Sequence, residues 1–393
     1  MRAIPTEERR ARLALRHHLA TPATEVREAA EAMVGLHSSD PATVYLSARA
    51  RIPGIKQDDI ASALYDERLV VRILAMRRTL FVVPVDMAPL LHNSSTVALI
   101  PAERKRLITM VEGAGIANDG KAWVEKAERR TLEALKARGE AVATDLTKDV
   151  SELREKITFY KRDGSVLTTV GMSTRVLFLL AAEGKIVRGR PRGSWVSSQY
   201  RWVPIESWIG GPMPEMGKSD AQAALLRRWL HTFGPGTELD VKWWTGWPVT
   251  QVRAALAAIG AVEVEVDSGP AYVLADDLEP VEPIRPWVAL LPSLDPTTMG
   301  WKERKWYLGP HYPRLFDRSG NAGQTVWVDG RIVGGWGQQP DGQITWELLE
   351  DVGSEADAEI ERHAAELQDW LGDTVFTARF RSPMDRALAK PTL

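Results

Sequence analysis

The sequence contains no cysteine among its 393 residues. This absence excludes disulfide bridges, thiolate metal sites and cysteine nucleophiles together. Long apolar runs are also missing, because the longest, Val176 to Ala182, is far shorter than the roughly 20 residues of a membrane-spanning helix. Residues 1–19 carry charges where a secretory signal needs an apolar core. We therefore expect a soluble, cytoplasmic protein that does not associate with membranes.

Signatures of metal and nucleotide chemistry are likewise absent. The seven histidines are scattered, and no H-E-x-x-H pattern or histidine–carboxylate cluster occurs. The sequence has no G-x-x-x-x-G-K-[ST] loop for phosphates and no G-x-S-x-G elbow for acyl transfer. We expect no metal and no cofactor. The adjacent His17 and His18 lie in a basic amphipathic segment, where we expect solvated or capping side chains.

Composition is that of a globular protein, with 44% apolar and 26% charged residues, and the length suggests two to four modules. The net charge is only −2, but nucleic-acid binding depends on local rather than total charge. Between Lys185 and Arg201 the chain carries five cations and no acid. Tryptophan is uneven too, because only Trp123 of the 15 tryptophans precedes Trp195.

The N-terminal part reads as helices followed by a two-stranded ribbon. Helical spacing and caps predict two helices within residues 5–36, a third over 42–51 and a fourth over 58–67. The runs LVVRIL and TLFVVP then predict two strands joined across residues 75–78. Helices that lead into a ribbon of this kind indicate a winged helix-turn-helix.

The same order of elements recurs along the chain. A second copy would end in a ribbon that turns at residues 191–193, with a short hairpin around residues 162–164, and a third would begin near Asp220. Beyond Pro283 the pattern becomes strand-rich and ends in a helix over residues 354–371. We predict an α+β fold of about three tandem winged helix-turn-helix modules and a β-rich C-terminal domain. The predicted divisions are 1–110, 111–215, 216–282 and 283–393.

The stretch His37-Ser38-Ser39-Asp40 places several polar groups at a helix junction in an otherwise apolar module. One interpretation is an N-cap, in which Ser39 or Asp40 accepts amide hydrogen bonds ahead of Pro41 at the first helical position. The other is catalytic. His37 and Ser39, two residues apart in an extended stretch, point to one side and could hold a water molecule between them. Spacing alone does not choose between the two.

Two basic segments are candidates for DNA contacts. In the second ribbon, cations alternate with aromatic residues, which suits phosphates along one edge and stacking at the tip, although a merely solvated hairpin is an alternative. The turn of the first ribbon repeats the theme more weakly. The candidate DNA-binding residues are Arg77, Arg78, Lys185, Arg188, Arg190, Arg192, Trp195 and Arg201.

Residues 35–54, GLHSSDPATVYLSARARIPG, resemble the signature of winged-helix DNA glycosylases of the AlkZ type, which runs roughly Leu-Gln-x-Gln-Asp-Pro before a helix rich in Leu and Ala. Further similar motifs follow in the same order over nearly the whole chain. They are RTLFVVP with Asp86, FGP and WWTG within 233–246, LLPSLDP at 290–296 and VDGRIVGGW at 328–336.

The resemblance implies a monofunctional DNA glycosylase that needs no metal or cofactor and releases N7-alkylated purines, including bulky antibiotic adducts, from double-stranded DNA. Some members confer self-resistance on bacteria that make DNA-alkylating compounds, and some branches act on interstrand crosslinks. The family's two glutamines, or glutamine and aspartate, match His37 and Ser39 here. In this role His37 would accept the proton of the attacking water, Ser39 would fix the water or the imidazole, and Asp40 would orient His37 or cap the helix.

A winged-helix DNA-binding regulator or lesion-binding protein without catalysis is the competing interpretation, because most winged helices are regulators and the family glutamines are replaced. Release of free alkylpurine from damaged DNA would distinguish the two. The predicted modules are not paired, so a two-fold operator-binding dimer is not indicated and we expect a monomer.

Overall fold

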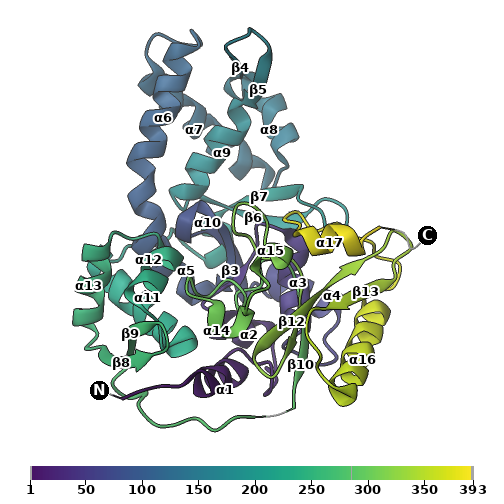
Figure 1. The fold of residues 1–393 in the computed structure, drawn as a ribbon. Coiled ribbons are helices and arrows are strands. Elements are labelled where there is room, and N and C mark those ends of the chain that lie inside the picture. The colour runs from purple at the N-terminus through teal and green to yellow at the C-terminus, as the bar shows by residue number, and fades with distance from the viewer. Residues whose placement is uncertain (1, 285, 391–393) are drawn as a thin grey trace.

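The computed structural model describes residues 2–284 and 286–390, and it shows a mixed helical and sheet fold with several small antiparallel sheets (Figure 1). In the described part of the chain, no helix combines the length and apolar character needed to cross a bilayer. The helices α6, α7 and α9 and the β4–β5 hairpin rise from the rest of the molecule, which holds both described ends of the chain.

The first unit forms around a three-stranded sheet of order β1-β3-β2. The predicted strands are confirmed, and their residues pair in register from Val70 with Pro84 to Leu74 with Leu80. A third, very short strand that was not predicted, β1, joins the outer side of β3. The elements are α1 (Thr6–Arg16), α2 (Val26–Ala32), β1 (Leu36–His37), α3 (Pro41–Arg49), α4 (Gln57–Ala61), β2 (Val70–Leu74) and β3 (Leu80–Pro84).

The second unit holds the tall helices and the ribbon β6–β7. The predicted hairpin around residues 162–164 is confirmed as β4–β5, and it exposes apolar side chains, with Tyr160 64% and Leu167 60% exposed. The elements are α5 (Ala88–Leu91), α6 (Ile100–Gly113), α7 (Gly120–Arg138), α8 (Ala143–Asp149), β4 (Lys156–Tyr160), β5 (Val166–Gly171), α9 (Met172–Ala182), β6 (Ile186–Pro191), β7 (Tyr200–Pro204) and α10 (Ile205–Ile209).

The third unit begins close to the predicted Asp220, which lies in the first turn of α11. Thr237 caps α12 as part of a capping box with Asp240, which fixes where this helix begins. The elements are α11 (Lys218–Phe233), α12 (Glu238–Thr245), α13 (Val249–Ala258), β8 (Val262–Val266) and β9 (Gly269–Val273).

The C-terminal region contains a four-stranded antiparallel sheet of order β10-β11-β12-β13. The predicted helix over residues 354–371 is confirmed, but it does not end the chain, because the short helix α17 follows it and packs on β12. The elements are β10 (Val288–Leu291), α14 (Lys305–Leu308), α15 (Tyr312–Leu315), β11 (Thr325–Val328), β12 (Arg331–Gln338), β13 (Ile344–Leu348), α16 (Ser354–Leu371) and α17 (Pro383–Leu388).

A shared pairing pattern links the first three units. In each, the second strand of the ribbon also pairs with a short segment from earlier in the unit. β3 pairs with β1, β7 forms a bridge between Trp202 and Ala141, and β9 forms a bridge between Tyr272 and Gly236. The repetition predicted from the order of elements is therefore visible in the hydrogen bonding.

Aromatic packing joins the first and third units to the C-terminal region in one large core. The Phe233 ring lies 5.7 Å from Trp229 and 5.3 Å from Trp301, and the His17 ring stacks on Trp301 at 5.7 Å. The expectation that His17 is solvated is wrong, because this side chain is fully buried and its Nδ1 pairs with Thr297 Oγ1 at 2.9 Å, although the residue does stand at the C-cap of α1. Most of the second unit instead packs around a core of its own, although Val187, Val203 and Ile205 belong to the large core.

A buried ion pair ties α3 to the segment after β10. Arg51 and Asp295 are both fully buried, and the guanidinium makes two parallel hydrogen bonds of 2.8 and 2.9 Å to the carboxylate. Ser47 Oγ donates a third bond to Asp295 at 2.6 Å, and Arg51 also donates to Thr297 Oγ1 at 2.8 Å. Because α3 begins at the His37–Asp40 stretch, this pair holds the helix on which that stretch depends.

Candidate functional site

The His37–Asp40 stretch runs from β1 to the first turn of α3. His37 pairs with Phe81 of β3, so a strand fixes its backbone. Gly35 precedes the strand with a φ of +110°, and a Cβ there would lie 2.8 Å from Val83 Cγ1, so both conformation and space require glycine. The stretch is therefore held by a sheet on one side and a helix on the other.

His37 is buried, with only 5% of its surface exposed, and its ring packs against Phe81 at 5.1 Å. Burial, and to a lesser extent the charge of Arg77, lowers the pKa of His37 to about 3. Its Nδ1 lies 3.4 Å from the backbone N–H of Ser39, a long contact in which the ring nitrogen accepts. The imidazole is thus neutral near pH 7, and the tautomer that fits this contact carries its proton on Nε2.

Ser39 is the residue of the stretch that reaches the surface, because it is partly exposed while His37, Ser38 and Asp40 are buried. Its Oγ accepts a long hydrogen bond of 3.5 Å from the N–H of Leu80. Its carbonyl oxygen accepts from Arg379 Nη1 at 3.3 Å. The hydroxyl proton remains available to a bound water or to DNA.

Asp40 is the N-cap of α3, as the capping interpretation predicted, with Pro41 at the first helical position. Its Oδ1 accepts from the N–H of Ala42 at 3.1 Å, and its Oδ2 accepts from the backbone N–H of Arg379 at 2.6 Å. Burial raises the pKa of Asp40, although these hydrogen bonds oppose the rise. Both oxygens are thus occupied by backbone amides, and the proposed orientation of His37 by Asp40 has no hydrogen bond to support it.

Two arginines that the sequence argument missed hold the stretch from opposite sides. Arg379, between α16 and α17, contacts Ser39 and Asp40 as described above. Arg72 of β2 is buried and donates from Nε to Ser38 Oγ at 2.6 Å and from Nη1 to Tyr65 Oη at 3.1 Å. An arginine inside the apolar run LVVRIL was a signal for Arg72, whereas nothing local pointed to Arg379.

The turn of the first ribbon exposes Arg77 and Arg78 beside the stretch. Both have left-handed backbone conformations, with φ of 53° and 63°. The Arg77 guanidinium lies over the Trp243 ring at 4.3 Å, and Arg78 pairs with Glu103 at 2.8 Å. Arg77 is close enough to His37 to affect its pKa, so the structure brings this predicted cation and the histidine together.

The cations of the second ribbon are less uniform than their sequence suggests. Three of them have carboxylate partners: Lys185 pairs with Glu183 at 2.6 Å, Arg190 with Asp66 at 2.7 Å and Arg201 with Glu140 at 3.2 Å. Among the described residues, none pairs its carboxylate with Arg188 or Arg192. Arg192 is exposed, and Arg188 is partly exposed with its guanidinium over the Trp202 ring at 4.6 Å.

Trp195 is half-buried against the protein rather than at a ribbon tip. The strand expected to follow the turn at residues 191–193 begins only at Tyr200, and residues 192–199 form a loop. Trp195 holds this loop down, because its ring packs at 4.9 Å from Tyr45 of α3 and 5.7 Å from Trp370 of α16. The ring is therefore engaged with protein aromatics in this structure.

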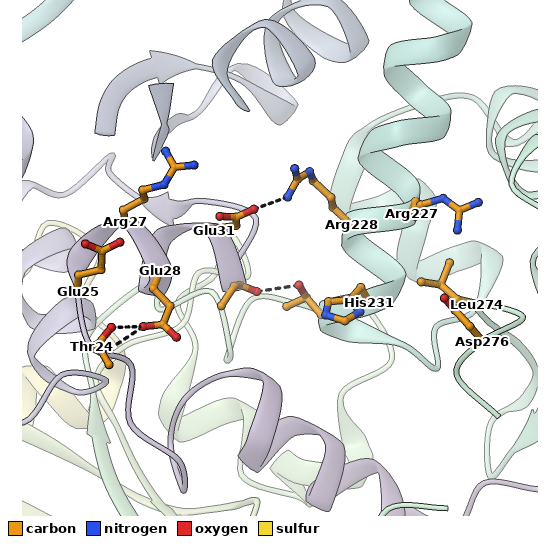
Figure 2. A pocket seen from close by; sticks show the side chains of 12 residues that line it. Thr24, Glu25, Arg27, Glu28, Glu31, Arg227, Arg228, His231, Leu274 and Asp276 are labelled. Carbon is orange, nitrogen blue, oxygen red and sulfur yellow. Dashed lines mark hydrogen bonds and ion pairs between the residues drawn. The ribbon is translucent and has the colours of Figure 1, made fainter. Parts of the chain in front are cut away.

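Two cavities of the described part of the chain lie away from His37 and Ser39. Figure 2 shows one of about 670 Å³ between α2 and α11, where Glu31 and Arg228 face each other at 2.8 Å. Its other charges are of both signs, so it does not select an anion or a cation. Another, of about 690 Å³, includes Lys185 and Glu183 beside residues 212–216. Of the stretch itself, only Ser39 is partly exposed.

The described residues contain no group of three or more histidine and acidic side chains that could hold a metal ion. The arrangement offers instead a neutral imidazole, one accessible hydroxyl and nearby arginines. Such groups can orient a water molecule and bind an anionic backbone, and they do not provide a strong acid.

Comparison with known proteins agrees with this chemistry. The family model described as "DNA glycosylase AlkZ-like" matches residues 30–370. Among solved structures, the fold is similar to that of Streptomyces sahachiroi DNA glycosylase AlkZ, with a TM-score of 0.70 and 18% sequence identity over 94% of this chain and 98% of the other. A search of curated proteins found no match. Because the family model covers most of the sequence, the chain belongs to the AlkZ-like DNA glycosylases and is a DNA glycosylase.

Proposed function

We propose that this enzyme hydrolyses the N-glycosidic bond of bulky N7-alkylguanine adducts in double-stranded DNA as a monomer, with Ser39 and His37 positioning the attacking water. The observation that carries the proposal is the placement of Ser39, because it is the polar residue of the family signature that emerges at the surface next to a neutral histidine. As in the resemblance drawn from sequence, no metal or cofactor takes part.

The chemistry suits a weakly basic histidine. An N7-alkylguanine is already cationic, so its bond to the sugar breaks without a strong acid, and the sugar develops positive charge as the base departs. Water that attacks such a cation loses its proton readily, so a strong base is not required. A protonated imidazole would repel the sugar cation, whereas the lowered pKa of His37 keeps it neutral.

The electrostatic surroundings support DNA as the substrate. Arg77 and Arg192 are exposed cations without carboxylate partners among the described residues, and they lie on the first and second ribbons. Such groups neutralise phosphates and release counterions. We infer that the three repeated units are winged helices whose ribbons face the DNA backbone, and Arg78, Lys185, Arg190 and Arg201 remain candidates that would first have to leave their carboxylates.

The small side chains around Ser39 favour a large adduct. A base-flipping enzyme needs a closed pocket that would exclude a polycyclic group. Ser38, Ser39, Ala42 and Thr43 have small side chains, and the two cavities described above lie elsewhere. The lesion therefore needs to present only its sugar to Ser39, and the adduct can stay in the duplex.

The test compares excision of N7-methylguanine with that of a polycyclic N7-guanine adduct under single-turnover conditions, with the freed base and the abasic site measured separately. Release of the polycyclic base supports the proposal. Release of the methyl lesion alone would contradict a site that admits large adducts, and binding of both duplexes without release would contradict hydrolysis at this site.

A further inference from the structure

Three arginines from distant parts of the chain gather behind and beside the signature. Arg72 lies with its guanidinium 4.4 Å from the ring of Tyr200 and bonds to Ser38. Arg379 bonds to the carbonyl of Ser39. Arg188 lies on β6, which packs against β2. It is close enough to Arg72, Tyr200 and Arg379 for each of them to affect its pKa.

Among the residues that the structure describes, none pairs a carboxylate with these three guanidinium groups, in contrast to their neighbours on the ribbon. Asp40 is the acid beside them, and its two oxygens are occupied by the amides of Ala42 and Arg379. The cluster therefore holds three positive charges to one negative. Burial, and after it repulsion from Arg72, lowers the pKa of Arg188 to about 10, which still leaves it charged at neutral pH.

Tyr200 adds an unused hydrogen-bond donor. The residue is only 9% exposed, and its Oη is buried without a hydrogen-bond partner. A buried hydroxyl without a partner is costly, and such groups in a folded protein call for an explanation such as a ligand. An anion with several acceptor oxygens would neutralise the excess positive charge and accept a hydrogen bond from the unpaired hydroxyl.

We propose that Arg188, Arg379 and Tyr200 form a seat for one backbone phosphate of the damaged strand, at the nucleotide whose base is excised or its immediate neighbour. The geometry sets this register, because Arg379 is bonded to the same Ser39 that we propose holds water at the sugar. Arg72 sits behind the seat and contributes charge. All four are positioning residues, and the assignment of register rests on the proposed glycosylase function.

The experiment uses intact duplexes in which a single phosphate near the lesion is replaced by a neutral methylphosphonate, one position at a time. Binding of the parent, Arg188→Gln and Arg190→Gln proteins is measured at fixed salt. Arg190 is a matched control, because it lies two residues away on the same strand, loses the same charge and has Asp66 as a partner. Excision is followed in parallel on the same duplexes.

We expect one methylphosphonate position to weaken binding of the parent about tenfold, as loss of a charged hydrogen bond does. In Arg188→Gln the penalty at that position should be smaller, because only Arg379 and Tyr200 still contact the phosphate, while Arg190→Gln should keep the full penalty. If Arg188→Gln and each methylphosphonate weaken binding by independent, additive amounts, Arg188 contacts none of these phosphates and the proposed phosphate site is wrong. If Arg188→Gln and one methylphosphonate are coupled in binding but no base is excised, the phosphate site is supported and the proposed function is refuted instead.

A second measurement guards against misfolding of the variant. Inorganic phosphate, titrated against sodium chloride of equal ionic strength, should raise the thermal midpoint of the parent and of Arg190→Gln, and Arg188→Lys should retain part of the effect. If phosphate stabilises the parent no more than chloride does, the protein has no specific phosphate-binding site and the proposal fails.

Discussion

The pH dependence of excision gives the most direct test of the role assigned to His37. Burial and the nearby Arg77 lower its pKa to about 3. At pH 5 only about 1% of such an imidazole is protonated, whereas about 97% of one with the ordinary pKa of about 6.5 would be. A water-positioning histidine must be neutral, so the two cases predict different rates in mildly acidic solution.

We expect the single-turnover rate constant for N7-methylguanine release to show no inflection near pH 6.5 between pH 5 and pH 8. Spontaneous depurination is subtracted at each pH, and circular dichroism verifies that the protein stays folded. His37→Ala should lower the rate at least about tenfold across this whole range, as loss of a hydrogen bond worth about 1.4 kcal/mol would, with DNA affinity nearly unchanged. Ser39→Ala should be milder because His37 would still hold the water.

A different profile would refute the reasoning. If the parent rate falls toward pH 5 with an apparent pKa near 6.5, and this fall disappears in His37→Asn, then the imidazole titrates as an exposed one and its burial is not what keeps it neutral. Equal rates for the parent and His37→Ala would remove His37 from the reaction altogether.

Three further outcomes follow from ion pairs and buried groups. In DNA-binding titrations, Arg77→Gln and Arg192→Gln should each reduce the slope of log affinity against log salt by about 0.9, and Arg190→Gln and Arg201→Gln by less, because the latter two already have carboxylate partners. Asp295→Leu should lower the free energy of unfolding in urea by about 3–5 kcal/mol by stranding the buried Arg51, and adding Arg51→Met should restore most of it. Burial lowers the pKa of His17 to about 3 and of His92 to about 4, so the unfolded chain binds more protons than the folded one between those values and about 6.5. Stability should therefore fall as the pH drops from 6.5 toward 4, by up to about 1.4 kcal/mol per pH unit for each histidine, and His17→Asn should flatten the urea midpoint profile.

Local signals in the sequence were sufficient wherever a short-range interaction decides the structure. Asp40 before Pro41 predicted the start of α3, and the apolar runs around residues 70–84 predicted the ribbon β2–β3. Each depends on hydrogen bonds or steric limits within a few residues, so no knowledge of the rest of the chain was required.

Long-range contacts explain what the sequence could not show. His17 was expected near solvent, yet its partners Thr297 and Trp301 lie some 280 residues further along the chain. The loop of residues 192–199 departs from a strand because Trp195 finds Tyr45 and Trp370 in other units. Neither contact produces a pattern in the neighbouring residues from which it could be predicted.

Counting charged residues along one stretch of sequence was misleading for the same reason, because it missed partners from outside the stretch. The segment from Lys185 to Arg201 contains no acid, but Glu183 stands two residues before it and pairs with Lys185. Asp66 and Glu140, from the first and second units, neutralise Arg190 and Arg201. Only a fold can distinguish the compensated cations from Arg188 and Arg192.

The attachment of the signature to late parts of the chain has a consequence for synthesis on the ribosome. Residues 37–40 are translated early, yet α3 is locked by Asp295 and the Ser39–Asp40 backbone by Arg379. Nascent chains fold from the N-terminus as they emerge, but contacts this far apart can form only when translation is nearly finished. The segment that we propose to be catalytic thus acquires its shape last, and a protein cut short by a late stop codon would carry the signature without the contacts that hold it in place.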